Sequence, residues 1–309
     1  MKRDNFVDYA RLGLAVSVCL FHLAPQYGTW PKGFRPDWAV PAFLSISGYY
    51  VLRSYELSAS WLEFIKKRAL RILPAFLISL LVVQLAGGFE MVKHVLLSYV
   101  TLGTVERDPL LNGPVWSLGA EEIAYAVLAV LFALGAYRRV WPIWVAFFVS
   151  GAIAAWVAAP TTDDHVMRIM DVVPAFFAGS LVYLNRDRVR GESAWGLLLI
   201  SAAVFALMFH VDGQPFGWWW WMPGTWMGLG ILSLRALRVP RIPDFSYGCY
   251  IYHMPFYALL VWPWWGYFPA FVLLCVGSWY LVERPVLSLK GGGRPVSVPV
   301  PAAVAPVET

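Results

Sequence analysis

The sequence predicts an all-α fold, a polytopic integral membrane bundle of about ten transmembrane helices. Three observations predict this class. Hydrophobic residues make up 59% of the 309-residue chain and charged residues only 14%, whereas soluble domains carry about a quarter charged residues. The mean hydropathy is +0.60. Aromatic residues reach 17%, an excess typical of membrane interfaces. This composition excludes a disordered, fibrous or disulfide-framework protein.

The predicted spans are apolar runs separated by charged or Pro/Gly-rich turns. A helix needs about 20 mostly apolar residues to cross a bilayer. Runs of about this length cover residues 7–26, 38–55, 70–87, 116–136, 140–159, 169–184, 194–210, 216–233, 245–262 and 265–282. The apolar stretch 91–102 is too short to span and is interpreted as a re-entrant or interfacial segment. We therefore assign residues 1–288 to one transmembrane domain and 289–309 to a flexible cytoplasmic tail.

The distribution of positive charge predicts the orientation of the chain. Ten spans place both termini on one side of the membrane, and most of the 24 Lys and Arg residues then fall in loops on that side. Loops rich in Lys and Arg face the cytoplasm. The sequence thus predicts a multi-pass protein of the cell membrane with cytoplasmic termini. The formal net charge of +5 is explained by this topology, and nucleic acid is not expected as a partner.

Ionisable side chains in the first predicted helix are candidate functional residues, because each costs about 2.5 kcal/mol or more to insert in a membrane. Arg11 and His22 are eleven residues apart and so share one helix face, about 16 Å apart along the axis. His22 can act as a general base at neutral pH. Two alternatives stay open: Asp8 and Arg11 as headgroup anchors, and His22 as a hydrogen-bonded structural residue.

A basic segment leads into the third predicted span. Arg68 and Arg71 are three residues apart, so their guanidinium groups project from neighbouring positions of one helix face. Two such groups are suited to grasp phosphate oxygens. The alternative is that they only fix the topology and contact anionic lipid.

Polar residues at the predicted outer mouth of the fourth span form a third group. Trp116 and Ser117 precede two adjacent carboxylates, Glu121 and Glu122. Either carboxylate could pair with His22 and raise its basicity, which makes both candidate catalytic residues. Alternatively, they occupy the first turn of the helix because acidic groups there are favoured by the helix dipole.

A fourth group lies in the ninth predicted span. Ser246, Tyr250 and His253 recur at helical spacing and line one face. They form either part of a substrate site or a polar seam between helices. We expect four residues of the third and fourth groups to contact the acceptor substrate: Trp116, Ser117, Tyr250 and His253. The three cysteines lie far apart in apolar runs, so neither a metal cluster nor a disulfide is expected.

Six segments together resemble the membrane-bound acyltransferase-3 family, whose members include bacterial polysaccharide O-acetyltransferases. The segments are Arg11-x10-His22, Phe43-Leu-Ser-Ile-Ser47-Gly48-Tyr-Tyr, Arg68-Ala-Leu-Arg71-Ile-Leu-Pro74, Trp116-Ser117-Leu-x-x-Glu121-Glu122, Ser246-Tyr-x-x-Tyr250-x-x-His253-x-Pro255 and Glu283-Arg284-Pro285. Each is weak alone, whereas their order and spacing across nearly the whole chain make the combination specific.

The resemblance implies an O-acyltransferase with ten transmembrane helices. It implies acyl-CoA, most simply acetyl-CoA, as the cytoplasmic donor and a hydroxyl of a sugar or glycan at the outer face as acceptor, with no metal. It also implies His22 as the catalytic base and Arg11, Arg68 and Arg71 as residues that bind the donor. A transporter or flippase for a lipid-linked or amphipathic solute is the alternative, because charged groups within the membrane would serve it equally.

Overall fold

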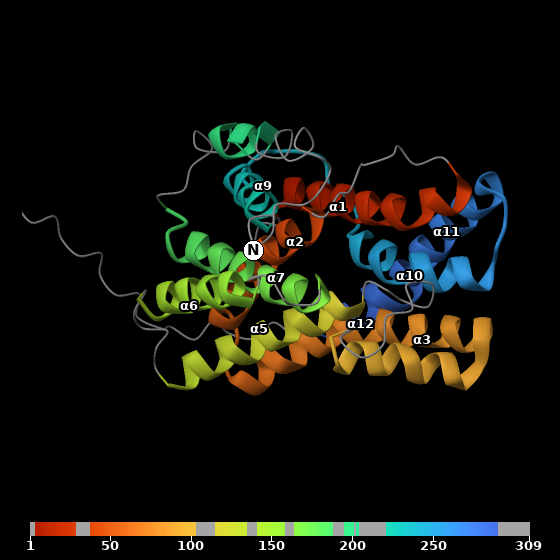
Figure 1. The fold of residues 1–309 in the computed structure, drawn as a ribbon, viewed down its shortest axis with the longest axis horizontal. Coiled ribbons are helices and arrows are strands. Elements are labelled where there is room, and N and C mark those ends of the chain that lie inside the picture. The colour runs from red at the N-terminus through yellow and green to blue at the C-terminus, as the bar shows by residue number, and fades with distance from the viewer. Residues whose placement is uncertain are drawn as a thin grey trace, which may run out of the picture.

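A computed structural model describes residues 4–28, 38–102, 115–134, 141–157, 164–187, 195–200, 202–203 and 221–289. Every regular element with assigned bounds in these residues is helical (Figure 1). In chain order these elements are α1 (Asn5–Leu23), η1 (Ala24–Tyr27), α2 (Ala39–Glu56), α3 (Trp61–Val100), α5 (Val115–Ala133), α6 (Trp141–Val157), α7 (Asp164–Leu184), α9 (Trp221–Ser233), α10 (Ser246–Leu259), α11 (Trp264–Ser278), η4 (Trp279–Glu283) and α12 (Arg284–Ser288).

Apolar side chains on the outside of the bundle identify the faces that contact lipid. Leu73, Leu77, Leu81 and Leu85 follow each other at four-residue intervals along α3 and are 48–66% exposed. Residues four apart lie on the same helix face. Soluble proteins rarely expose so continuous an apolar stripe. The helical membrane bundle predicted from the sequence is therefore confirmed.

The described helices differ in length. Three segments are long and apolar enough to cross a membrane by themselves: Asn5–Tyr27, Trp61–Val100 and Trp264–Ser288. Others are shorter, such as α9 with 13 residues and α10 with 14, which give about 20 Å at 1.5 Å per residue. Most of the predicted span 194–210 lies outside the described residues, as does nearly all of the predicted tail. The number of ten spans stays a prediction.

Helix α2 lies at the centre of one group of helices and packs closely against α7 and α9 (Figure 1). Its approach to α7 depends on two glycines, because a Cβ at Gly48 would lie 1.9 Å from the carbonyl oxygen of Phe176 and one at Gly179 1.7 Å from that of Ser45. Small residues let helix backbones approach in membranes. These contacts hold α2 in the position from which Ser47, Arg53 and Ser54 reach the site.

Helix α3 reverses direction at Gly88. This residue has φ 77° and ψ −169°, a backbone conformation that favours glycine. The rings of Phe76 and Tyr99 lie 5.1 Å apart, although 23 residues of straight helix would separate them by about 34 Å. The stretch 91–102, predicted to be re-entrant or interfacial, accordingly forms most of a short second arm that folds back on the first.

The start of α3 is set by a local hydrogen-bond pattern. The backbone N–H of Glu63 donates to the Ser60 hydroxyl at 3.2 Å, and the Glu63 carboxylate accepts from the backbone N–H of Ala59 at 2.6 Å. This reciprocal arrangement resembles a capping box. Because the helix begins here, Arg68 and Arg71 fall on its second and third turns, on the side that faces α1 and α2.

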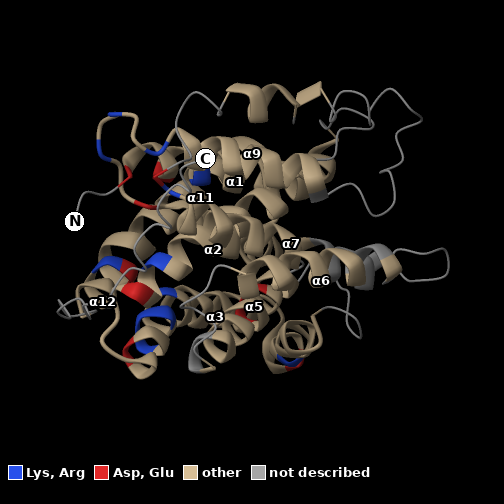
Figure 2. Ribbon diagram, turned by 90° about the vertical axis from the view of Figure 1, so that its left-hand side faces the viewer, with Lys and Arg blue, Asp and Glu red and all other residues tan. Residues whose placement is uncertain are grey.

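Two core clusters divide the bundle. One is built mainly from α2 and α7 with parts of α1, α3, α5, α6 and α9, and the other from α1, α3, α10 and α11 with the start of α5. Most described charged residues gather at one end, beside the N-terminus and α12 (Figure 2). We call this the charged end. The candidate site lies there, where the two clusters meet.

Candidate active site

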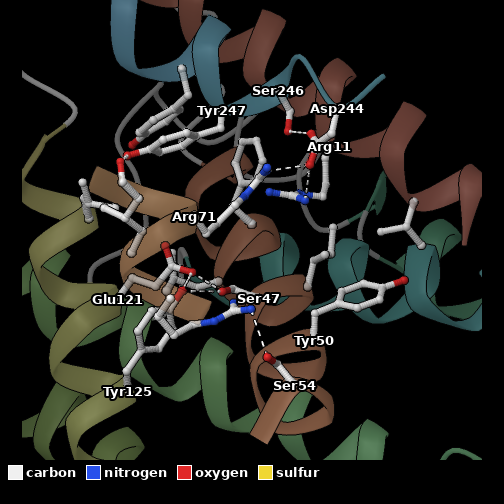
Figure 3. Close-up of a pocket in the computed structure, with 18 of the residues that line it drawn as sticks. Arg11, Ser47, Tyr50, Ser54, Arg71, Glu121, Tyr125, Asp244, Ser246 and Tyr247 are labelled. Carbon is white, nitrogen blue, oxygen red and sulfur yellow. Dashed lines mark hydrogen bonds and ion pairs between the residues drawn. The ribbon is translucent and has the colours of Figure 1, made fainter. Parts of the chain in front are cut away.

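A cavity of about 510 Å³ opens between the two clusters. Its walls come from α1, α2, α3, α5 and the residues around the start of α10. Figure 3 shows two groups of polar side chains in it, one around Arg11, Arg71 and Asp244 and the other around Ser47 and Glu121. The cavity therefore brings together donor-side residues that the sequence predicted from separate helices.

Asp244 holds two of the predicted donor-binding arginines. Its Oδ2 accepts from Nη1 of Arg11 at 2.9 Å and from Nη2 of Arg71 at 2.6 Å. Its Oδ1 accepts from the hydroxyl of Ser246 at 2.5 Å. The Asp244 side chain is only 6% exposed. One carboxylate thus places guanidinium groups from α1 and α3 side by side.

Arg68 has a different environment. Its Nη2 donates to the Ser54 hydroxyl at 3.1 Å, whereas its Nε–H is buried with no hydrogen-bond partner. None of the ion pairs found among the described residues includes Arg68. A buried donor without a partner costs about 1–3 kcal/mol. An anion that entered the cavity would satisfy this donor and neutralise the charge.

The two predicted carboxylates point to different partners. Glu121 lines the cavity and accepts hydrogen bonds from the hydroxyls of Ser47 and Tyr125. Glu122 accepts from the hydroxyl of Tyr99 on the second arm of α3. Of the two carboxylates, Glu121 is therefore the one that faces the cavity. The role of either carboxylate in catalysis stays a prediction.

Of the residues predicted to contact the acceptor, two line the cavity wall and one packs into a hydrophobic core cluster. The hydroxyls of Ser117 and Tyr250 lie 2.6 Å apart, and both residues line the cavity. Trp116 packs, partly buried, against the core cluster of α2 and α7. The Tyr250 ring also packs edge-on against Phe43 at 5.8 Å. The cavity therefore ends at a wall in which Tyr250 is hydrogen-bonded across to α5.

His22 contacts His253 beyond this wall. Nδ1 of His22 lies 3.1 Å from Nε2 of His253 and 3.0 Å from the carbonyl oxygen of Val18. The rings of Tyr250 and His253 are 6.4 Å apart. Neither histidine lines the cavity, whereas Tyr250, whose ring adjoins that of His253, does. Where the sequence suggested a carboxylate as partner of His22, the structure gives it a second histidine.

Several polar residues of the cavity were not among the predicted site residues, notably Ser47, Tyr125 and Asp244. Asp244 had one available signal, since it is the only acidic residue between Asp212 and Glu283. No group of three or more His, Cys, Asp or Glu side chains within the described ranges is arranged to hold a metal ion.

Comparisons with known proteins identify the family. The acyltransferase-3 family model, described as an acyltransferase domain, matches residues 4–283. Nodulation protein 10 of Rhizobium leguminosarum bv. viciae is 27% identical over 93% of this chain and 94% of its own length. An O-acetyl transferase of Shigella phage Sf6 is 25% identical over 93% of this chain and 97% of its own. No solved structure matches. Because the family model covers nearly the whole chain, the protein belongs to the acyltransferase-3 family and is an O-acyltransferase.

Proposed function

We propose that the protein transfers an acyl group, in the simplest case acetyl, from cytoplasmic acyl-CoA to a hydroxyl of a sugar or polysaccharide at the outer face of the cell membrane. The observation that carries this proposal is the arrangement along α1. Arg11 lies in the cavity at the charged end, and His22 lies eleven residues further along the same helix, about 16 Å away. A long thin donor could bridge these two positions.

The charged end is proposed as the donor entrance. CoA carries phosphates, and guanidinium groups bind phosphate oxygens through paired N–H donors. Arg68 offers an unsatisfied buried Nε–H, while Arg11 and Arg71 are held in place by Asp244. The loops at this end are also the positively charged ones, which supports a cytoplasmic location.

The thioester is proposed to travel from the cavity past Tyr250 to His22. In the cavity, Glu121 accepts hydrogen bonds from Ser47 and Tyr125. We assign Glu121 the role of holding these two side chains in place. Passage requires the Tyr250 side chain to swing away from Ser117, which breaks one hydroxyl–hydroxyl hydrogen bond. A hydrogen bond of this kind contributes about 1 kcal/mol net to stability.

The reaction itself is proposed as a direct transfer. His22 removes the proton of the acceptor hydroxyl, and the hydroxyl oxygen attacks the acyl carbon of the thioester. The carbon–sulfur bond then breaks, and the CoA thiolate takes the proton back from the imidazolium. Atoms and charges balance without a further reactant. Ser117, Trp116, Tyr250 and His253 are the residues that the sequence proposed for acceptor contact.

A label-transfer assay tests this function. Membranes that contain the protein are supplied with acetyl-CoA carrying a labelled acetyl group, and the glycan fraction is analysed by radioactivity and mass spectrometry. We expect label in the glycan with the wild type and with His94→Ala, a control on the exposed side of α3. His22→Ala should show none while remaining inserted and folded. Retained transfer by His22→Ala would remove His22 from the mechanism.

A further inference from the structure

His22 and His253 form a pair of imidazoles in direct contact. Their ring centroids are 5.1 Å apart, and the closest nitrogens 3.1 Å. His22 belongs to α1 and His253 to α10, two helices that pack along each other. His253 is completely buried. A buried polar ring is costly unless its nitrogens are hydrogen-bonded. Each ring nitrogen of the pair must therefore act either as a donor or as an acceptor, which determines where the hydrogens lie.

The carbonyl groups around the pair determine which nitrogens carry hydrogen. Nδ1 of His253 lies 2.8 Å from the carbonyl oxygen of Tyr250. Because a carbonyl only accepts, this nitrogen must be an N–H. The other nitrogen of a neutral imidazole is an acceptor, so Nε2 of His253 accepts a hydrogen from Nδ1 of His22. The carbonyl of Val18, 3.0 Å from the same Nδ1, requires a hydrogen at this position too.

It follows that neutral His22 keeps its lone pair on Nε2. We infer that His253 is a positioning residue for the proposed base: it holds His22 in the tautomer whose Nε2 takes the acceptor proton, and it accepts a hydrogen bond from the imidazolium that results. This inference rests on the proposed function. It replaces the acceptor contact that the sequence suggested for His253 with an action through His22.

The hydrogen bond between the rings changes strength during the reaction. When the acceptor O–H bond breaks, its proton goes to Nε2 of His22, and the ring becomes positively charged until the departing CoA thiolate takes the proton. A hydrogen bond from a charged donor is roughly twice as strong as a neutral one. The contact with His253 therefore stabilises the charged state more than the resting state. Interactions of this kind affect kcat rather than KM.

Two substitutions separate positioning from packing. His253→Gln keeps a hydrogen-bonding amide, whereas His253→Leu keeps only apolar volume. We expect His253→Leu to lower the maximal rate of labelled acetyl transfer to membrane glycan by about 10- to 100-fold, the effect of one hydrogen bond to a charged group, at unchanged KM for acetyl-CoA. His253→Gln should recover most of the rate. Tyr252→Phe is the matched control, because it removes a neighbouring buried hydroxyl bonded to Ser278, and should keep the wild-type rate.

Three outcomes overturn the inference. One is a wild-type maximal rate for His253→Leu. Another is a raised KM for the glycan at unchanged maximal rate, which would assign His253 to the acceptor. The third is an Nε2–H tautomer of His22, observed by nitrogen NMR of wild-type protein with labelled histidine. This measurement decides the question if His253→Leu does not fold, and an Nδ1–H tautomer supports the inference. Failure of the proposed function is distinct, since the wild type itself would then transfer no label.

Discussion

Arg68 offers a hydrogen-bond donor in the cavity to which a donor phosphate could bind. Its buried Nε–H lacks a partner among the described residues, and a CoA phosphate would supply charge-assisted hydrogen bonds of about 1.5–3 kcal/mol. We expect Arg68→Ala to raise the KM for acetyl-CoA by about 10- to 100-fold, as measured in steady-state label transfer. The exposed Lys66, two residues before Arg68, gives the control Lys66→Ala. An unchanged KM in Arg68→Ala would contradict the assignment of the donor site.

Asp244 should matter for stability far more than the comparable carboxylate Asp4. Asp244 holds two arginines and is 6% exposed, while Asp4 pairs with Arg53 at 19% exposure. Removing one partner of a buried ion pair costs about 3–5 kcal/mol, and Asp244 holds two arginines whereas Asp4 holds one arginine and the Tyr50 hydroxyl. Thermal unfolding in detergent should show a much lower Tm for Asp244→Asn than for Asp4→Asn. Equal Tm values would mean that Asp244 is not needed to hold the arginines.

Single residues within one helix could be predicted from spacing, and contacts between distant helices could not. The intervals from Arg11 to His22 and from Arg68 to Arg71 give their relative placement directly, because helix geometry is regular. The partners of Arg11 and His22 lie 233 and 231 residues later in the chain. Their pairing depends on how α1 packs against α10 and its preceding loop, which periodicity does not encode.

At the scale of elements, the approach of α2 to α7 makes a sharp stability prediction. A Cβ at Gly179 would lie 1.7 Å from the carbonyl oxygen of Ser45, so the backbones must move apart. Overpacking of this kind costs about 1–3 kcal/mol. Gly179→Ala should therefore lower the Tm. Gly151→Ala is the matched control, because nothing lies within 4 Å of its Cβ, and alanine favours helix over glycine. A Tm for Gly179→Ala at or above that of the control would refute this packing.

Element boundaries were predicted well where an apolar run ended in charge, and less well at α3. The sequence separated the span 70–87 from the stretch 91–102 because Gly87, Gly88 and Glu90 interrupt the run. It predicted a re-entrant or interfacial segment, but not that its Tyr99 contacts Phe76 and Glu122. The reversal depends on the positive φ of Gly88, a feature that hydropathy does not report.

At the scale of the whole molecule, the charged end and the histidine pair are two separate candidate functional regions. Arginines gather around one cavity, and His22 lies about 16 Å further along α1. Apolar stripes such as the one on α3 place the molecule in lipid. Composition predicted the helical membrane bundle because a bilayer constrains a chain more simply than water does.

Sealed membrane vesicles of opposite orientation test transfer across the bilayer. Acetyl-CoA is too polar to cross lipid, so it reaches the arginine cavity only from the face to which it is added. Inside-out vesicles, which expose the cytoplasmic face, should label glycan from external acetyl-CoA, and right-side-out vesicles should not. Equal labelling by both orientations, or labelling by inside-out vesicles that carry His22→Ala, would contradict a donor that enters at the arginines and reacts at His22.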